Sequence, residues 1–123
     1  MNKKTAKLIK QYWSLSELLY DIASNPKTSF NDLEQLAKLN DEYVLTAVAL
    51  NPKTPVKLLK NFYKHYSGIG GTDEEMRVHI INNPALTTKL LKKYAKNDES
   101  DMVKSAAKEA LKRKTNKKET NLD

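Results

Sequence analysis

Cysteine is absent from this 123-residue sequence, and other absences narrow its chemistry further. Without cysteine the chain has no disulfide, no thiolate metal site, no iron–sulfur cluster and no cysteine nucleophile. No long apolar run is present, so the sequence predicts neither a signal peptide nor a membrane span, and a cytoplasmic location is the default expectation. No long stretch alternates apolar and polar residues, which favours an all-α protein.

Glycine is also scarce, and its three residues lie together. Gly68, Gly70 and Gly71 all fall in the stretch KHYSGIGGTDEE. Glycine-rich loops can cradle phosphates, but this stretch lacks the preceding strand and the Gly-Lys-Ser/Thr ending of such motifs. Two interpretations of residues 67–71 therefore stay open, a mobile surface loop and a binding loop.

One short phrase, an apolar run followed by Asn-Pro, occurs three times. The asparagines are Asn25, Asn51 and Asn83, which lie 26 and 32 positions apart. Alignment on these asparagines places apolar residues in four shared columns: Leu18, Val44 and Met76; Ile22, Val48 and Ile80; Leu33, Leu59 and Leu91; Leu36, Phe62 and Tyr94. A further step of 26 or 27 positions reaches Val103 and Ala107, and Glu109-Ala110 stands in place of Asn-Pro. Self-similarity at this period indicates about three and a half stacked repeats.

Each unit is expected to consist of two short helices with the Asn-Pro pair at the corner between them. A residue before proline avoids the helical region, so the first helix ends at the asparagine. Thr54 followed by Pro55 is typical of the start of the second helix. The corner asparagines Asn25, Asn51 and Asn83 are therefore predicted to be structural, with side chains that satisfy loop carbonyls and amides.

Two further helix starts carry the spacing of a capping box. Ser14 and Glu17 form one such pair, with Trp13 and Leu18 placed for a hydrophobic staple across it. The second pair is Thr72 and Glu75. Together these signals predict seven or eight helices and no sheet.

The chain divides into three predicted parts. Residues 1–12 are expected to form a capping helix, residues 13–111 a repeat domain, and residues 112–123 a basic, disordered tail. The repeats are expected at about 15–40, 41–72 and 73–98, with a partial repeat at 99–111. The tail holds five of the 22 basic and two of the 15 acidic residues, so it carries +3 of the net charge of +7. Its one apolar residue, Leu122, is too little to bury.

The segment VLTAVALNPKTPVKLLKNF, residues 44–62, resembles the leucine-rich repeat variant family, whose right-handed α-solenoid is similar in shape to HEAT and armadillo repeats. The resemblance covers roughly residues 15–111. It departs from the family in three respects: a slightly longer unit, an insertion in the second unit, and a last unit without Asn-Pro. The resemblance implies a short right-handed α-solenoid that acts as a scaffold and catalyses no reaction.

Residues suited to catalysis do not come together in the sequence. His65 and His79 have no accompanying arrangement of acids and nucleophiles. The carboxylates of residues 41–42 and 73–75 stand at expected helix starts, where the helix dipole favours negative charge. No group of residues has the spacing of a metal site. The sequence therefore predicts a protein that is not an enzyme and that has no cofactor or metal.

The most conspicuous surface pattern consists of seven lysines: Lys57, Lys60, Lys64, Lys89, Lys92, Lys93 and Lys96. The first three recur at helical spacing in the second unit, and the others fill or adjoin the same columns in the third unit. Stacking would place them in two parallel rows on neighbouring helices. They are either an ordinary solvated helix face or a surface for a polyanion or acidic partner, because stacked like charges are costly without a counter-charge.

Two functions therefore compete. The first is a non-enzymatic protein-interaction scaffold, the usual role of α-helical repeats. The alternative is a module that binds nucleic-acid phosphates through the lysine rows. Only Arg77 and Arg113 are arginines, and base reading favours bidentate guanidinium contacts, so nucleic-acid binding would have little sequence specificity. The partner is expected to be another protein rather than a membrane, and the chain a monomer or weakly self-associating.

Overall fold

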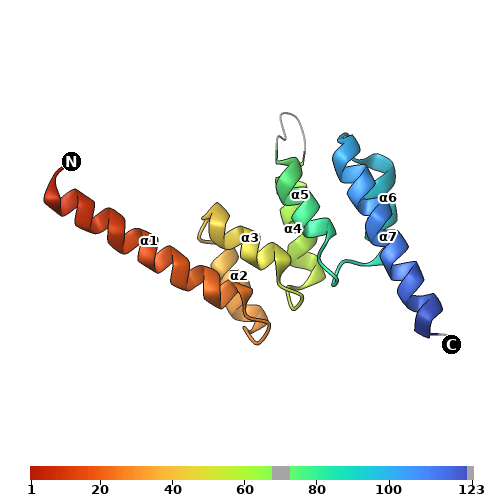
Figure 1. Cartoon of the computed structure of the whole chain (residues 1–123), viewed down its shortest axis with the longest axis horizontal. Coiled ribbons are helices and arrows are strands. Elements are labelled where there is room, and N and C mark those ends of the chain that lie inside the picture. The colour runs from red at the N-terminus through yellow and green to blue at the C-terminus, as the bar shows by residue number, and fades with distance from the viewer. Residues whose placement is uncertain (68–72, 122–123) are drawn as a thin grey trace.

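The computed structural model describes the backbone of residues 1–67 and 73–121, and the side chains as far as residue 116. These residues form seven α-helices and no strand, which confirms the all-α prediction. The helices are α1 (Lys3–Ser24), α2 (Phe30–Ala37), α3 (Glu42–Leu50), α4 (Val56–His65), α5 (Glu74–Ile81), α6 (Thr88–Asn97) and α7 (Asp101–Asn121). They follow one another along the long axis of the molecule, from α1 at one end to α6 and α7 at the other (Figure 1).

Several helix starts are capped by side chains. Asp41 accepts hydrogen bonds from the amides of the first turn of α3, and Thr87 accepts one from the third residue of α6. Helix α4 begins one residue later than predicted, at Val56, and Pro55 precedes it without a side-chain cap. The Thr54 hydroxyl instead donates to the Val48 carbonyl oxygen at 2.6 Å. It is therefore used to close the corner and does not cap the helix.

The glycine-rich stretch and part of the second capping box cannot be compared with the structure. Gly68, Gly70, Gly71 and Thr72 lie outside the described residues. Helix α5 follows this stretch, with Asp73 preceding it and making no side-chain capping bond.

The predicted helix start at Ser14 is wrong, because α1 is one continuous helix of 22 residues. Residues 1–12 are thus not a separate capping helix. Trp13 and Leu18, the predicted staple, are 60% and 61% exposed. The segment contains neither glycine nor proline, so continuing the helix costs less than interrupting it and nucleating a new one. Ser14 and Glu17 have the spacing of a capping box, but a capping box forms only where a helix starts, and no helix starts at Ser14.

The segment predicted as a disordered tail is helical as far as Asn121, because α7 continues through it. Lysine, arginine and glutamate are good helix formers and make up six of the ten residues at positions 112–121, which include neither glycine nor proline. Two of its basic residues also bond to the third corner. The Arg113 guanidinium donates to the Asn82 side-chain oxygen at 2.9 Å, and the Lys114 ammonium donates to the Leu86 carbonyl oxygen at 2.5 Å.

The core is built by packing the first helix of each unit on the first helix of the next, α1 on α3, α3 on α5 and α5 on α7. The second helices pack against these, α2 on α3, α4 on α5 and α6 on α7. Leu33, Leu59 and Leu91, which share one sequence column, are all fully buried. The first unit breaks the pattern in two other columns: Val44 and Val48 are fully buried, whereas their counterparts Leu18 and Ile22 are 61% and 48% exposed.

The three corners are joined by a ladder of asparagine side chains. The Asn51 amide nitrogen donates to the carbonyl oxygens of Ala23 and Asn25, at 2.8 and 2.9 Å. Asn83 repeats this one unit later, donating to Ala49 and Asn51 at 2.7 and 2.8 Å. The side-chain oxygen of each of the three corner asparagines accepts a backbone amide two residues ahead. Each later corner is thereby bonded both to itself and to the corner before it.

Candidate partner-binding cleft

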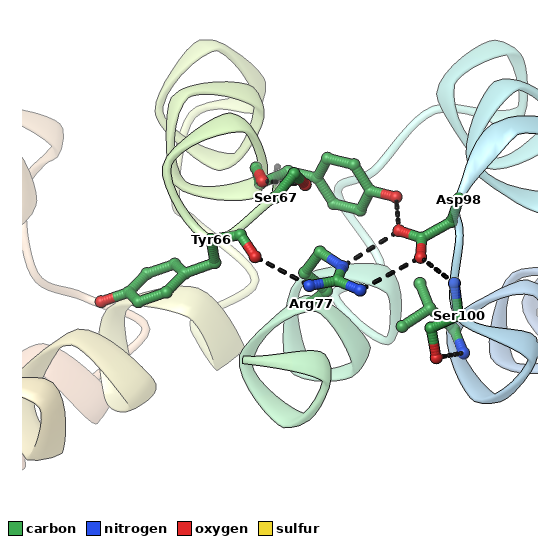
Figure 2. Close-up of polar contacts among 7 residues, drawn as sticks. Tyr66, Ser67, Arg77, Asp98 and Ser100 are labelled. Carbon is green, nitrogen blue, oxygen red and sulfur yellow. Dashed lines mark hydrogen bonds and ion pairs between the residues drawn. The ribbon is translucent and has the colours of Figure 1, made fainter. Parts of the chain in front are cut away.

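A buried ion pair joins α5 to the end of α6. The Arg77 guanidinium, on α5, donates two hydrogen bonds to the carboxylate of Asp98 at the end of α6, at 3.0 and 3.1 Å. A third nitrogen atom donates to the Tyr66 carbonyl oxygen at 2.7 Å. Figure 2 shows the guanidinium lying between this carbonyl and the carboxylate. The residues of the pair are only 4% and 7% exposed.

The Asp98 carboxylate also connects α4 and the start of α7. It accepts hydrogen bonds from the Tyr63 hydroxyl and from the Ser100 amide, the latter at 2.9 Å (Figure 2). The Tyr63 ring stacks on the Tyr94 ring of α6, with centroids 3.6 Å apart and planes 13° from parallel. Four helices thus meet at one carboxylate, and its position is strongly constrained.

The network also determines which groups carry charge. Burial opposes ionisation of Asp98, but hydrogen bonds from Arg77, Tyr63 and the Ser100 amide outweigh it and hold the Asp98 pKa below its ordinary value. Burial, followed by the hydrogen bond to Asp98, raises the Tyr63 pKa above its ordinary range. Burial also raises the Tyr94 pKa. The network therefore consists of an ionised Asp98–Arg77 pair flanked by two neutral tyrosine rings.

An open cleft lies over this network, which forms its floor. The volume of the cleft, about 790 Å³, is within the range of ligand-binding sites. Its other lining residues come from α4, from the start of α5, from α6 and from the segments that follow α4 and α6. They are Lys60, Asn61, Lys64, Ser67, Glu74, Lys93, Asn97, Glu99 and Ser100. The cleft therefore combines exposed lysine ammonium groups, carboxylates and amides above an aromatic and ionic floor.

The structure divides the seven predicted lysines into two sets. All seven are exposed, and none makes an ion pair with a described residue. Lys60, Lys64 and Lys93 line the cleft, whereas Lys57, Lys89, Lys92 and Lys96 do not. The corner asparagines Asn25, Asn51 and Asn83 lie away from the cleft and act in the corner ladder.

Sequence reasoning missed the Arg77–Asp98 pair. One signal was present: Arg77 occupies the column of Leu19 and Leu45, so an arginine stands where the other units place an apolar residue. Such a substitution indicates that a counter-charge is buried with it. Nothing in the sequence identifies Asp98 as that counter-charge, because many exposed acids lie at similar distances along the chain.

Metal-binding groups, membrane-spanning helices and similarity to known proteins give no further indication of function. No group of three or more metal-binding side chains occurs among the residues that the structure describes. Within the same residues, no helix is both long and apolar enough to cross a membrane. The chain matches no protein-family model, no curated protein and no solved structure.

We expect the stability that Asp98 provides to disappear in acid. Because its pKa is lower in the folded than in the unfolded chain, its ionisation stabilises the fold fully above the unfolded-state pKa of about 3.9. That contribution is lost as the pH falls through the lower folded-state pKa. Urea unfolding at a series of pH values should show the wild-type chain and Asp98→Asn converging in acid. A constant difference down to the most acidic pH would contradict this role for the charge.

Proposed function

We propose that this protein is a non-catalytic scaffold of α-helical repeats that binds an acidic segment of another protein in the cleft. The scaffold we propose is a short right-handed α-solenoid of the leucine-rich repeat variant kind. The repeated corner phrase, the asparagine ladder and the packing of first helix on first helix support it.

The observation that carries the proposal is the set of three lysines that line one cleft and have no ion-pair partner among the described residues. Lys60 and Lys64 come from α4 and Lys93 comes from α6, so two units contribute to one site. Their ammonium groups can each pair with a carboxylate of the partner, a charge-assisted contact that is stronger than a neutral hydrogen bond. The fixed floor lowers the cost of ordering the site on binding.

An acidic peptide fits this cleft better than a nucleic-acid backbone does. Glu74 and Glu99 also line the cleft, and their carboxylates repel a continuous row of phosphates. A peptide can instead place its carboxylates at the lysines and its backbone amides at the glutamates. The volume matches a few side chains of an extended segment.

The test compares two variants of equal charge. Lys60→Gln with Lys93→Gln removes two cleft lysines, and Lys57→Gln with Lys89→Gln removes two lysines from the same helices outside the cleft. With a fluorescent oligoglutamate peptide as the probe, the cleft variant should bind about tenfold more weakly or worse, measured by anisotropy. The control variant should bind within a small factor of the wild type.

A single-stranded oligonucleotide of matched charge separates the alternative function from this one. Equal losses in both variants, with tighter binding to the oligonucleotide than to the peptide, would favour phosphate binding by the lysine rows. The logarithm of the binding constant would then fall linearly with the logarithm of salt concentration, with a slope of about −0.7 per contacted phosphate. Absence of binding to either probe would contradict both functions.

A further inference from the structure

Helix α1 carries a stripe of exposed apolar side chains that no described residue covers. Leu8, Leu15, Leu18 and Ile22 are 57%, 55%, 61% and 48% exposed. Their spacing, with Gln11 completing it, repeats every seven residues as in the seam of paired helices. Leu18 and Ile22 also share columns with residues that are buried in the later units. The stripe therefore has the composition of a protein core but faces solvent. An exposed apolar patch of this kind indicates an interaction surface.

The charges beside this stripe are divided between the two ends of the helix. Lys7, Ser14 and Asp21 recur at seven-residue spacing along one flank of the stripe. The first part of α1 is basic, with Lys3, Lys4, Lys7 and Lys10, and the later part carries the acids Glu17 and Asp21. All these charged residues are exposed, and none has an ion-pair partner among the described residues. When two α1 helices lie antiparallel, the basic part of each therefore lies beside the acidic part of the other.

We propose that the partner of this stripe is the α1 helix of a second copy of the chain, packed antiparallel. A two-fold axis near Ser14 brings Lys7 of each copy beside Asp21 of the other. It also buries the apolar stripe of each helix against that of its partner. Parallel packing would set the basic halves against each other, at an electrostatic cost. The contact uses the same surface on both copies, so it closes as a dimer.

The shape of the molecule leaves room for this partner. The N-terminal half of α1 projects beyond the other helices at one end of the molecule (Figure 1). A helix of 22 residues is about 33 Å long, enough for a paired seam of several turns. A projecting helix is only marginally stable in water, and an apolar partner stabilises it. The opposite end of the molecule is less suited, because α7 is rich in lysine and three of its apolar residues, Val103, Ala107 and Ala110, are already buried.

Sedimentation equilibrium tests the dimer directly. The wild-type chain should have twice the mass of one chain, and Leu15→Glu should have the mass of one chain, because it places charge at the centre of the seam. Met102→Glu is the control, since Met102 is a similarly exposed apolar residue, on α7. It should remain dimeric. A monomeric wild type at all accessible concentrations, which would leave the stripe to another protein, overturns the proposal, and so does a dimeric Leu15→Glu.

Charge reversal tests the orientation without disturbing the apolar seam. Lys7→Glu alone and Asp21→Lys alone should each raise the dimer dissociation constant several-fold, and the two together should restore it. Because the chain has no cysteine, engineered thiols report proximity cleanly. Under oxidation, Ser14→Cys should cross-link to itself, whereas Lys7→Cys should cross-link to Asp21→Cys only when the two are mixed. Self-cross-linking of Lys7→Cys, or a double reversal no better than the single ones, would contradict antiparallel packing.

The dimer and the cleft can fail independently. The stripe lies on α1, and the cleft is lined by residues that lie between Lys60 and Ser100. Leu15→Glu should therefore bind the oligoglutamate peptide as the wild-type chain does, and Lys60→Gln with Lys93→Gln should remain dimeric.

Discussion

Replacing Asp98 with asparagine is expected to lower the free energy of unfolding by about 3–5 kcal/mol, the scale for breaking one side of a buried ion pair. The substitution keeps the shape of the side chain and an oxygen atom that can still accept from the Ser100 amide. What it removes is the negative charge opposite Arg77, which is only 4% exposed. The guanidinium is then held in a poorly solvated site without its counter-charge. Urea unfolding at neutral pH measures the loss.

Two comparisons separate this effect from a general loss of an acid. Asp101→Asn makes the same chemical change at an exposed position in the first turn of α7, and should cost about 1 kcal/mol or less. Arg77→Leu in the Asp98→Asn background removes the stranded charge and installs the residue type found in the same column of the other units. It should recover part of the lost stability. Equal stability of Asp98→Asn and the wild type would show that the ion pair does not stabilise the fold.

Replacing Asn51 with alanine is expected to cost about 2–4 kcal/mol, because it removes three hydrogen bonds of a buried side chain. Two carbonyl oxygens of the preceding corner, at Ala23 and Asn25, and the amide of Lys53 lose their side-chain partner. A methyl group cannot replace these bonds, and the site is too enclosed for water to do so without rearrangement. Thermal and urea unfolding both report the loss.

The first corner provides the matched control for the ladder. Asn25 is exposed, and its side-chain oxygen accepts a hydrogen bond from the Lys27 amide within its own turn. Asn25→Ala should therefore cost about 1 kcal/mol. Asn83→Ala should resemble Asn51→Ala, since Asn83 also bonds to the corner before it. Equal costs at all three positions would show that the asparagines serve only their own turns.

Local chemistry explains why much of the fold could be predicted from sequence. Each corner combines an asparagine, a proline that ends the preceding helix and apolar residues at helical spacing, and these act within a few residues of one another. The all-α class and the corners at Asn25, Asn51 and Asn83 follow from them. Helix lengths followed less well. A capping-box spacing at Ser14 does not interrupt a helix that has no breaker, and a charged segment after residue 111 is helical.

The candidate site was only half visible in the sequence. Lysine spacing identified the helices that carry Lys60, Lys64 and Lys93, because residues on one face of a helix follow from its period. Which lysines line the cleft depends on how α4, α5 and α6 pack, and the Arg77–Asp98 pair joins residues 21 positions apart in the chain. Such pairing results from packing and has no local signature.

The sequence by itself determined the helical class, the recurring Asn-Pro phrase and the chemistry of its corners, because propensity, proline geometry and side-chain capping are short-range effects. Only the tertiary structure decided that Leu18 and Ile22 face solvent while Val44 and Val48 are buried. The residues are of the same type and lie in the same columns, so their pattern is the same in each unit. Burial depends on whether another helix lies against that face. In the structure α1 lies against α3, and the stripe on α1 has no described helix against it.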